Sequence, residues 1–440
     1  MIKSLLKRVV IAILTWEAKM ILKKYRPKVV GITGSVGKTS TKEAVATVLA
    51  TKYDVRKSPK SYNSEFGVPL TVIGRTSAWG SLSGWLLNIL AGLKPLLTKQ
   101  PYPEWLVLEI GADRPGDIAG LMRWLKLDVA VVTTIPEIPV HIEFFPSKES
   151  LIAEKGAIAR GLLPNGTAVL NVDDPNVAGM VGKFTAVLNA GEGKILTYGR
   201  SKDADLSASS EKILYKEDAE SSMPDGITFK LDYGGKSVPV RLKGVFGTHH
   251  VYTALAALSV GVSQNLNMIT MLEVLVEHET PAGRLRALPG IKGTVILDDT
   301  YNSSPAALEA ALDTLDAIKC QGRKIAVIGD MMELGGYAMK VHTDIGIYAA
   351  GICDYIFTVG PRAKLVAEGA KERGFDESKL IHCSDAVDAG KKLQQLIEAG
   401  DLILVKGSQS MRMEKTVEEI MAEPERKGEL LTRQYEGWVE

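Results

Sequence analysis

The residues best suited to chemistry lie in a glycine-rich segment near the N-terminus. Residues 28–33 (KVVGIT) form a short run rich in β-branched side chains, and residues 34–40 (GSVGKTS) separate it from a helical pattern. Strand, glycine loop and helix is the context that a phosphate-binding loop requires. The loop's N–H groups can contact phosphate oxygens, Lys38 can reach the β and γ phosphates, and the Thr39 hydroxyl can hold Mg²⁺. The segment therefore predicts a nucleoside triphosphate site.

The spacing of this loop differs from the strict phosphate-loop pattern. Ile32 stands where that pattern has its first glycine, and Gly34 lies three residues before Gly37. The alternative is a tight strand-to-helix turn with an incidental lysine. Two glycines, a lysine and a threonine in the required context favour the nucleotide site.

Three further side chains could complete a reaction site. Glu109 ends the apolar run 105–109 (WLVLE), and open α/β sheets bind ligands at the C-terminal ends of their strands. His141 also follows a strand pattern. Lys155 lies in a helical pattern among apolar neighbours, where burial would favour the neutral amine that reacts with CO₂. On the residues alone, a solvated acid, a structural histidine and a surface lysine remain open alternatives.

These residues fall in segments that, in order along the chain, resemble the Mur ligase family, and most closely its D-alanyl-D-alanine-adding branch. The similarity runs from about residue 28 to about residue 419. It rests on residues 33–40 (TGSVGKTS), 60–69 (KSYNSEFGVP), 106–112 (LVLEIGA), 141–145 (HIEFF), 154–156 (EKG), 171–174 (NVDD), 247–249 (GTH), 283–284 (GR), 298–302 (DDTYN), 329–335 (GDMMELG), His342 and 406–408 (KGS).

The resemblance implies an ATP-dependent amide ligase that forms ADP and phosphate. A carboxylate of a muramyl-peptide precursor would be activated as an acyl phosphate and attacked by the amine of an amino acid or dipeptide, D-Ala-D-Ala. The implied catalytic residues are Lys38, Glu109, His141, Lys155 and Arg284. The implied ATP contacts are Gly34, Ser35, Gly37, Lys38, Thr39, Ser40, His249, Arg284 and Asp299. Two Mg²⁺ ions would be held by Thr39, Glu109, His141 and a carbamylated Lys155. The acid and amine would meet Asn63, Ser64, Glu65, Tyr301, Asn302, Asp330, Glu333, His342, Lys406 and Ser408.

Two departures from the family pattern keep alternatives open. Only 27 residues precede the first predicted strand, which predicts no independent domain for a uridine nucleotide. His250 and Thr253 replace two amide side chains near the expected adenine site. One alternative is therefore the same chemistry on another acid, such as a lipid-linked precursor, a folate-like polyglutamate acceptor or a cofactor acid. Another is an ATP-binding protein without ligase activity, against which the intact set of predicted catalytic residues argues.

The pattern of elements predicts an α/β protein with parallel sheets on both sides of Pro281. We expect an N-terminal amphipathic helix (1–27), a central phosphate-loop ATPase domain (28–279) and a Rossmann-like C-terminal domain (280–440), with the cleft between the last two. The polar interval 201–242 predicts a β insertion in the central domain.

Composition narrows the partners and the compartment. The formal net charge of +1 offers no field that would attract nucleic acid, which leaves small-molecule substrates. The three cysteines lack the spacing of a disulfide framework or zinc ribbon, as expected for a reducing cytoplasm.

The first 27 residues predict a basic amphipathic helix. Its apolar residues recur every three or four positions, at Ile2, Leu5, Leu6, Val9, Ile13, Trp16 and Met20. Its uncharged run is too short to span a bilayer. We expect this stripe to pack on the next domain. The alternative is an interfacial anchor at the inner face of the membrane, which a second apolar stretch at 79–97 keeps open.

Overall fold

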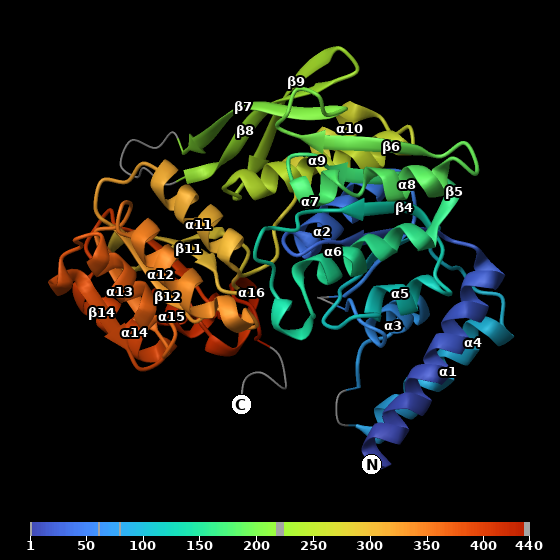
Figure 1. Ribbon diagram of the computed structural model, residues 1–440, viewed down its shortest axis with the longest axis horizontal. Helices are drawn as coiled ribbons and strands as arrows, with labels where there is room; N and C mark the ends of the chain where they lie inside the picture. Colours follow the sequence, from blue (N-terminus) through green and yellow to red (C-terminus); the bar gives the residue numbers. More distant parts are fainter. Residues whose placement is uncertain (1, 60–61, 79–80, 217–223, 435–440) are drawn as a thin grey trace.

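The computed structural model describes residues 2–59, 62–78, 81–216 and 224–434, apart from the side chains of residues 2–6 and 82. Within these residues the chain forms two α/β halves that lie side by side, each built on its own sheet (Figure 1). The predicted α/β fold with two sheets is confirmed.

The first sheet has nine described strands in the order β2-β3-β1-β4-β5-β6-β7-β8-β9. In this order, neighbouring strands from β2 across to β7, β1 included, pair in parallel. Strand β8 pairs antiparallel with β7 and with β9. Their bounds are β1 Lys28–Thr33, β2 Val55–Lys57, β3 Trp105–Glu109, β4 Leu127–Val132, β5 Leu162–Asn171, β6 Lys194–Gly199, β7 Leu206–Tyr215, β8 Pro224–Tyr233 and β9 Lys236–Lys243. The interval predicted as a β insertion thus extends this sheet as β7 to β9.

Helices cover both faces of the first sheet because its central strands are apolar on both sides. Val30 and Ile32 of β1 pack toward α2 (Lys38–Leu49) and α9 (Thr248–Ser263), whereas Val29 packs into the core of the opposite face. Further helices of this half are α3 Gly67–Ile73, α5 Asp117–Met122, α6 Lys148–Gly156, α7 Pro175–Ala178, α8 Val181–Leu188 and α10 Met268–Val276. The alternation of β1 side chains thus builds two cores.

The second sheet has six described strands in the order β10-β11-β15-β12-β13-β14, all parallel except β10. Their bounds are β10 Arg286–Pro289, β11 Val295–Asp299, β12 Lys324–Gly329, β13 Tyr355–Val359, β14 Leu380–Cys383 and β15 Leu402–Lys406. The helices of this half are α11 Pro305–Ala317, α12 Ala338–Ala349, α13 Lys364–Glu372, α14 Ala386–Leu396, α15 Glu414–Ile420 and α16 Lys427–Leu430. The C-terminal ends of its central strands therefore carry Asp299, Gly329 and Lys406.

Helices α1 (Ile2–Tyr25) and α4 (Leu82–Leu97) lie together at the side of the molecule remote from the second sheet (Figure 1). The Lys24 Nζ donates hydrogen bonds to the carbonyl oxygens of Pro95 (2.7 Å) and Thr98 (2.7 Å), which fastens α1 to the end of α4. No helix in the described part of the chain has the length and apolar character needed to cross a membrane.

The helix predicted at the N-terminus is present, but it packs through another face than expected. Leu14, Ala18 and Ile21 are buried, whereas Trp16 and Met20 of the predicted stripe are exposed. The helix carries apolar side chains on two opposite faces, and the sequence pattern alone did not distinguish them.

Glu17 of α1 is fully buried beside α4, and neither oxygen of its carboxylate has a hydrogen-bond partner among the described residues. The close approach depends on Gly92 of α4, because a Cβ there would lie 2.2 Å from the Glu17 Oε2. Burial raises the pKa of Glu17 to about 7 from an ordinary value of 4.5. The proton is therefore held by the folded protein over a pH range in which the unfolded chain releases it.

We expect Glu17→Gln to stabilise the fold increasingly as pH rises. Below about pH 4.5 the carboxyl is protonated in both states, so it does not affect stability. Between about pH 4.5 and 7 the Glu17 carboxyl is ionised in the unfolded chain but still protonated in the folded protein. This difference lowers the free energy of unfolding by on the order of 2 to 3 kcal/mol by pH 8. Urea unfolding of both proteins at pH 5 and pH 8 measures this difference, with the exposed Glu192→Gln as control. If the difference in the free energy of unfolding between Glu17→Gln and the wild type does not grow from pH 5 to pH 8, the prediction is wrong.

Candidate active site

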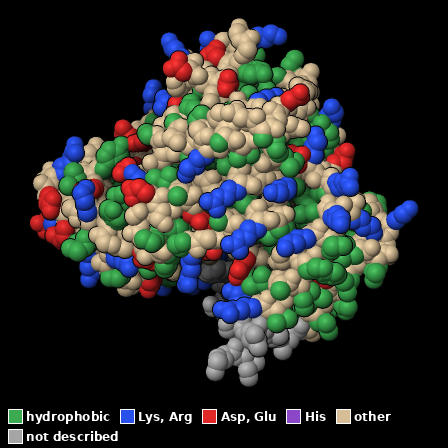
Figure 2. Space-filling model, turned by 45° about the vertical axis from the view of Figure 1, so that its right-hand side comes forward, with side chains coloured by type: hydrophobic (Ala, Val, Ile, Leu, Met, Phe, Trp, Pro, Cys, Tyr) green, Lys and Arg blue, Asp and Glu red, His purple; other side chains and the backbone are tan. Residues whose placement is uncertain are grey.

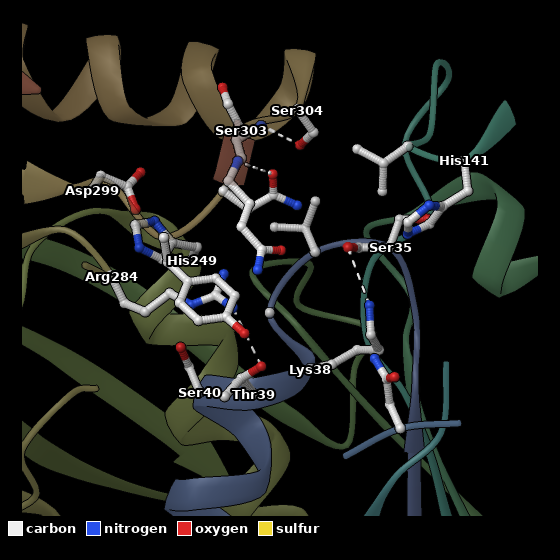
Figure 3. A pocket seen from close by; sticks show the side chains of 18 of the residues that line it. Ser35, Lys38, Thr39, Ser40, His141, His249, Arg284, Asp299, Ser303 and Ser304 are labelled. Carbon is white, nitrogen blue, oxygen red and sulfur yellow. Dashed lines mark hydrogen bonds between the residues drawn. The ribbon is translucent and has the colours of Figure 1, made fainter. Parts of the chain in front are cut away.

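A pocket of about 440 Å³ lies between the two halves of the molecule, at the C-terminal ends of strands from both sheets. Figure 3 shows labelled side chains reaching into it from the phosphate loop, from the segment around His141 and from the second half. The predicted residues that line it are Ser35, Gly37, Lys38, Thr39, Ser40, Asn63, Glu109, His141, His249, Arg284, Asp299, Tyr301, Asn302, Glu333 and Lys406.

The loop between β1 and α2 has the backbone geometry of an anion cradle. Gly34 has φ 142°, and a Cβ there would lie 2.0 Å from the Thr133 Oγ1, so this position requires glycine. Gly37 has φ 85°, caps α2, and has open space beside it. The Ser35 N–H donates to the Thr134 carbonyl oxygen at 2.7 Å, which fixes the loop against the end of β4. The start of α2 is thereby presented to the pocket.

Lys38 and Lys155 converge on one carbonyl oxygen of this loop. The Nζ atoms of both lysines donate to the Gly34 O at 3.0 Å. Burial lowers the pKa of Lys38, and burial followed by repulsion from Lys38 lowers the pKa of Lys155 to about 7. Lys155, on α6, is almost completely buried and lies behind the loop. A substantial neutral fraction of its amine near pH 7 follows from these surroundings.

Glu109 at the end of β3 is buried beside the first turn of α2. The Thr39 Oγ1 donates to its Oε2 at 3.0 Å, and the Asn63 Nδ2 lies 3.4 Å from its Oε1. A hydroxyl and a carboxylate next to a phosphate loop are the protein ligands that Mg²⁺ takes when phosphates and water supply the others. These two side chains fit one Mg²⁺. The described residues contain no group of three or more His, Cys, Asp or Glu side chains gathered for a metal ion.

His141 joins the first half to the second. Its Nδ1 lies 2.7 Å from the Glu333 Oε2, and its Nε2 lies 3.7 Å from the Asp113 Oδ1. Both His141 (φ 67°) and Glu333 (φ 63°) have left-handed backbones, which are strained for residues other than glycine. The hydrogen bond from His141 lowers the pKa of the Glu333 carboxyl. The contact between His141 and Glu333 thus closes the pocket on this side.

Arg284 closes the pocket on the opposite side. Its Nη2 donates to the Thr39 Oγ1 at 3.3 Å, and its guanidinium lies 4.0 Å from the centre of the Tyr301 ring. Its carbonyl oxygen lies 3.3 Å from the Nε2 of His250, which anchors the connection to α9. The cation of Arg284 is therefore held at the phosphate loop.

The pocket floor between the halves holds a buried charge pair and an unprotonated histidine. The Lys406 Nζ donates to the Asp299 Oδ2 at 2.6 Å and to the Asn302 carbonyl oxygen at 2.9 Å. Burial, then repulsion from Lys406 and Arg284, lowers the pKa of His249 to about 3. His249 is therefore neutral at physiological pH.

Several predicted site residues lie outside the pocket lining. Ser64 and Glu65 are exposed. Asp330, His342 and Ser408 instead bind backbone groups: the Ala363 N–H at 2.7 Å, the Met331 N–H at 3.0 Å and the Met332 N–H at 2.8 Å, respectively. In this arrangement the three side chains position the segment that carries Glu333.

Other lining residues had not been singled out from the sequence. Asp113 faces His141, and Ser303, Ser304 and Gln409 line the pocket across from the phosphate loop. Ser304 caps α11 by accepting a hydrogen bond from the Ala307 N–H at 3.3 Å. A serine directly before a proline and a helical pattern was the sequence feature that could have indicated Ser304 as a helix cap.

The fold and the site define a class of enzyme: a phosphate loop at a strand edge faces a second α/β layer, with lysine and arginine cations where phosphate charge would gather. That is the arrangement of a nucleotide-dependent ligase or transferase. Matches to two family models identify this class more narrowly. Residues 88–261 match the Mur ligase middle domain, and residues 283–409 match the Mur ligase, glutamate ligase domain. The chain belongs to the Mur ligase family and is an ATP-dependent ligase.

Individual relatives agree with this assignment. The chain is 28% identical to UDP-N-acetylmuramoyl-tripeptide–D-alanyl-D-alanine ligase of Bacillus subtilis, with 92% of this chain and 79% of the relative covered. It is 26% identical to the crystal structure of MurF ligase from Thermotoga maritima in complex with ADP, with TM-score 0.74 and coverage of 95% and 84%. Its fold is similar to that of Mycobacterium tuberculosis folylpolyglutamate synthase complexed with ADP, at 16% identity, TM-score 0.63 and coverage of 92% and 94%.

Proposed function

We propose that this chain joins D-Ala-D-Ala, or a related amino acid or dipeptide, to a carboxylate of a muramyl-peptide precursor. The observation that carries the proposal is the hydrogen bond between Arg284 and Thr39, which holds a cation of the second half at the phosphate loop. The relatives named for this reaction, which match over most of the chain, supply the substrate class.

Different residues of the pocket would act at different steps of this reaction. Lys38 and Arg284 would stabilise the negative charge that builds up as the γ-phosphoryl group moves to the carboxylate of the acid. Thr39 and Glu109 would hold Mg²⁺, which offsets phosphate charge when bound. The amine would then attack the acyl phosphate, forming the amide bond and releasing phosphate. Tyr301, Asn302 and Glu333, which line the pocket from the second half, are our candidates for the amine side.

A second Mg²⁺ would need one further change in the chain. Lys155 donates to a carbonyl, its ammonium form cannot bind a cation, and Mg²⁺ prefers oxygen ligands, which a carbamate on its Nζ would supply. Its lowered pKa and its burial support that reaction with CO₂. His141 would be the other ligand, released from Glu333. We place this enzyme among cytoplasmic, small-molecule ligases of cell-wall peptide synthesis.

The test is product identification. We expect purified protein with ATP, Mg²⁺, a UDP-linked muramyl tripeptide and D-Ala-D-Ala to give one ADP per amide product, seen by mass spectrometry. Parallel reactions replace the acid with a lipid-linked muramyl peptide or a folate, and the amine with single amino acids. A product only with a lipid-linked or folate acid would keep the ligase chemistry and change the acid. ATP binding without product from any pair would indicate a binding protein.

A further inference from the structure

The outer surface of α1 and α4 is rich in large apolar side chains that are exposed to solvent. Figure 2 shows hydrophobic side chains gathered at the lower right, where this helix pair lies. Trp16 is 52% exposed and Leu97 is 82% exposed. Among the described side chains, the large hydrophobic residues exposed on the pair are Val9, Trp16, Met20, Leu86, Leu87, Leu90 and Leu97. Soluble proteins rarely leave such residues contiguous on the surface without a partner.

Helical spacing shows that these residues form stripes and are not scattered. Val9, Trp16 and Met20 recur at seven and four residues, so they share the face of α1 opposite to the buried Leu14, Ala18 and Ile21. In α4, Leu86, Leu90 and Leu97 recur at four and seven residues, on the face opposite to the buried Asn88 and Gly92. Each helix therefore has a second face suited to an apolar medium.

The exposed charges on the two helices themselves have one sign. Arg8, Lys19, Lys23 and Lys94 are exposed on the two helices, and Figure 2 shows lysine and arginine side chains along the margin of the apolar area. The sole acidic residue in α1 and α4 is Glu17, which is buried in the helix pair. No exposed carboxylate on these helices would oppose an anionic partner.

We propose that the α1–α4 pair docks on the surface of a membrane that contains anionic lipids. The apolar side chains would enter the boundary between headgroups and acyl chains, with Trp16 at the depth that tryptophan favours. The lysines would reach the lipid phosphates while their methylene stems lie along the apolar layer. A second copy of this chain fits less well, because its identical cationic margin would repel the first.

The helix pair also contacts the segment that carries the pocket residue Asn63. The Phe66 ring packs against Trp85 of α4, with ring centres 5.6 Å apart, and the Lys7 Nζ of α1 lies 5.1 Å from the centre of the same ring. Three residues earlier, Asn63 lines the pocket beside Glu109. Docking would therefore place the Glu109 side of the pocket near the lipid surface.

Flotation of the full-length protein with vesicles tests the docking. We expect at least about tenfold stronger binding to phosphatidylcholine vesicles with about 30% phosphatidylglycerol than to phosphatidylcholine alone, and weaker binding at high salt. Trp16→Glu with Leu90→Glu should abolish binding, and Lys19→Gln with Lys94→Gln should weaken binding to the anionic vesicles alone. The control pair, Ile269→Glu with Met339→Glu, places the same charges at exposed apolar positions elsewhere and should bind as the wild type does.

Three results would overturn the proposal: no binding of the wild type, equal binding to both vesicle types, or unchanged binding by the folded Trp16→Glu, Leu90→Glu protein. Circular dichroism and the melting temperature establish that each variant is folded. Size-exclusion chromatography without lipid tests the alternative that a second copy of this chain covers the surface. A wild-type dimer that these two substitutions dissociate, together with failure to bind vesicles, would assign the surface to a second copy. Because flotation requires no turnover, its result is independent of which acid and amine are joined.

Discussion

Replacing Lys38 with alanine is expected to lower the rate of ADP formation by about 10²- to 10³-fold while leaving the fold intact. The ammonium group lies at the phosphate loop, 3.0 Å from the Gly34 carbonyl oxygen, so its loss removes a cation from the place where phosphoryl charge builds up. A coupled assay for ADP, with the acid and amine identified by mass spectrometry, measures the effect.

The control for this variant is Lys202→Ala, which removes an exposed lysine far from the pocket lining and should leave turnover unchanged. Equal melting temperatures would show that both variants are folded. Near wild-type ADP formation by folded Lys38→Ala would remove the lysine from the mechanism, and with it the assignment of residues 34–40 as the reacting phosphate site.

Lys155→Ala should lose nearly all activity, and a short carboxylic acid added to the buffer should restore part of it. The substitution leaves a cavity behind the loop that a small carboxylate can fill, which would replace the oxygen ligands of a carbamate. Lys183→Ala is the matched control, because this exposed lysine lies beside Gly156, the residue after Lys155. Full activity of Lys155→Ala in buffer depleted of CO₂ would exclude the carbamate.

The pKa of Lys155 gives the same hypothesis a pH signature. With the pKa near 7, the amine is protonated and unreactive toward CO₂ below that pH, and it becomes neutral above it. At constant CO₂, carbamate formation and activity should therefore rise through about pH 7. Mass spectrometry or ¹³C labelling of the carbamate reports the modification directly.

The sequence predicted the phosphate loop because its determinants are local. The positive φ of Gly34 and Gly37 and the short reach of Lys38 back to the loop depend on residues within a few positions. Glu109 was equally accessible to prediction, since a strand end in a parallel sheet fixes where its side chain lies. The comparisons confirm the family, the fold class and the ligase activity. The roles of the site residues stay predictions.

What the sequence could not predict depends on distant segments. Nothing in the pattern around His141 indicates that its partner is Glu333, nearly 200 residues away. Asp330 and Ser408 follow strand ends as expected, and His342 lies within α12. All three side chains bind backbone groups, because loops that leave a sheet need hydrogen bonds of their own. For α1, apolar residues occur on opposite faces, so periodicity could not determine which face packs inward.

The core that α2 and α9 share with the first sheet does not end at the boundary between the two halves. It continues through Leu308 and Leu312 of α11 and Ile345 of α12, so one set of buried side chains underlies both sheets. Separating the halves completely would expose that shared apolar surface to water, which is unfavourable. The two halves are therefore thermodynamically coupled. A ligand that binds in the pocket adds to the stability of the whole molecule rather than of one lobe.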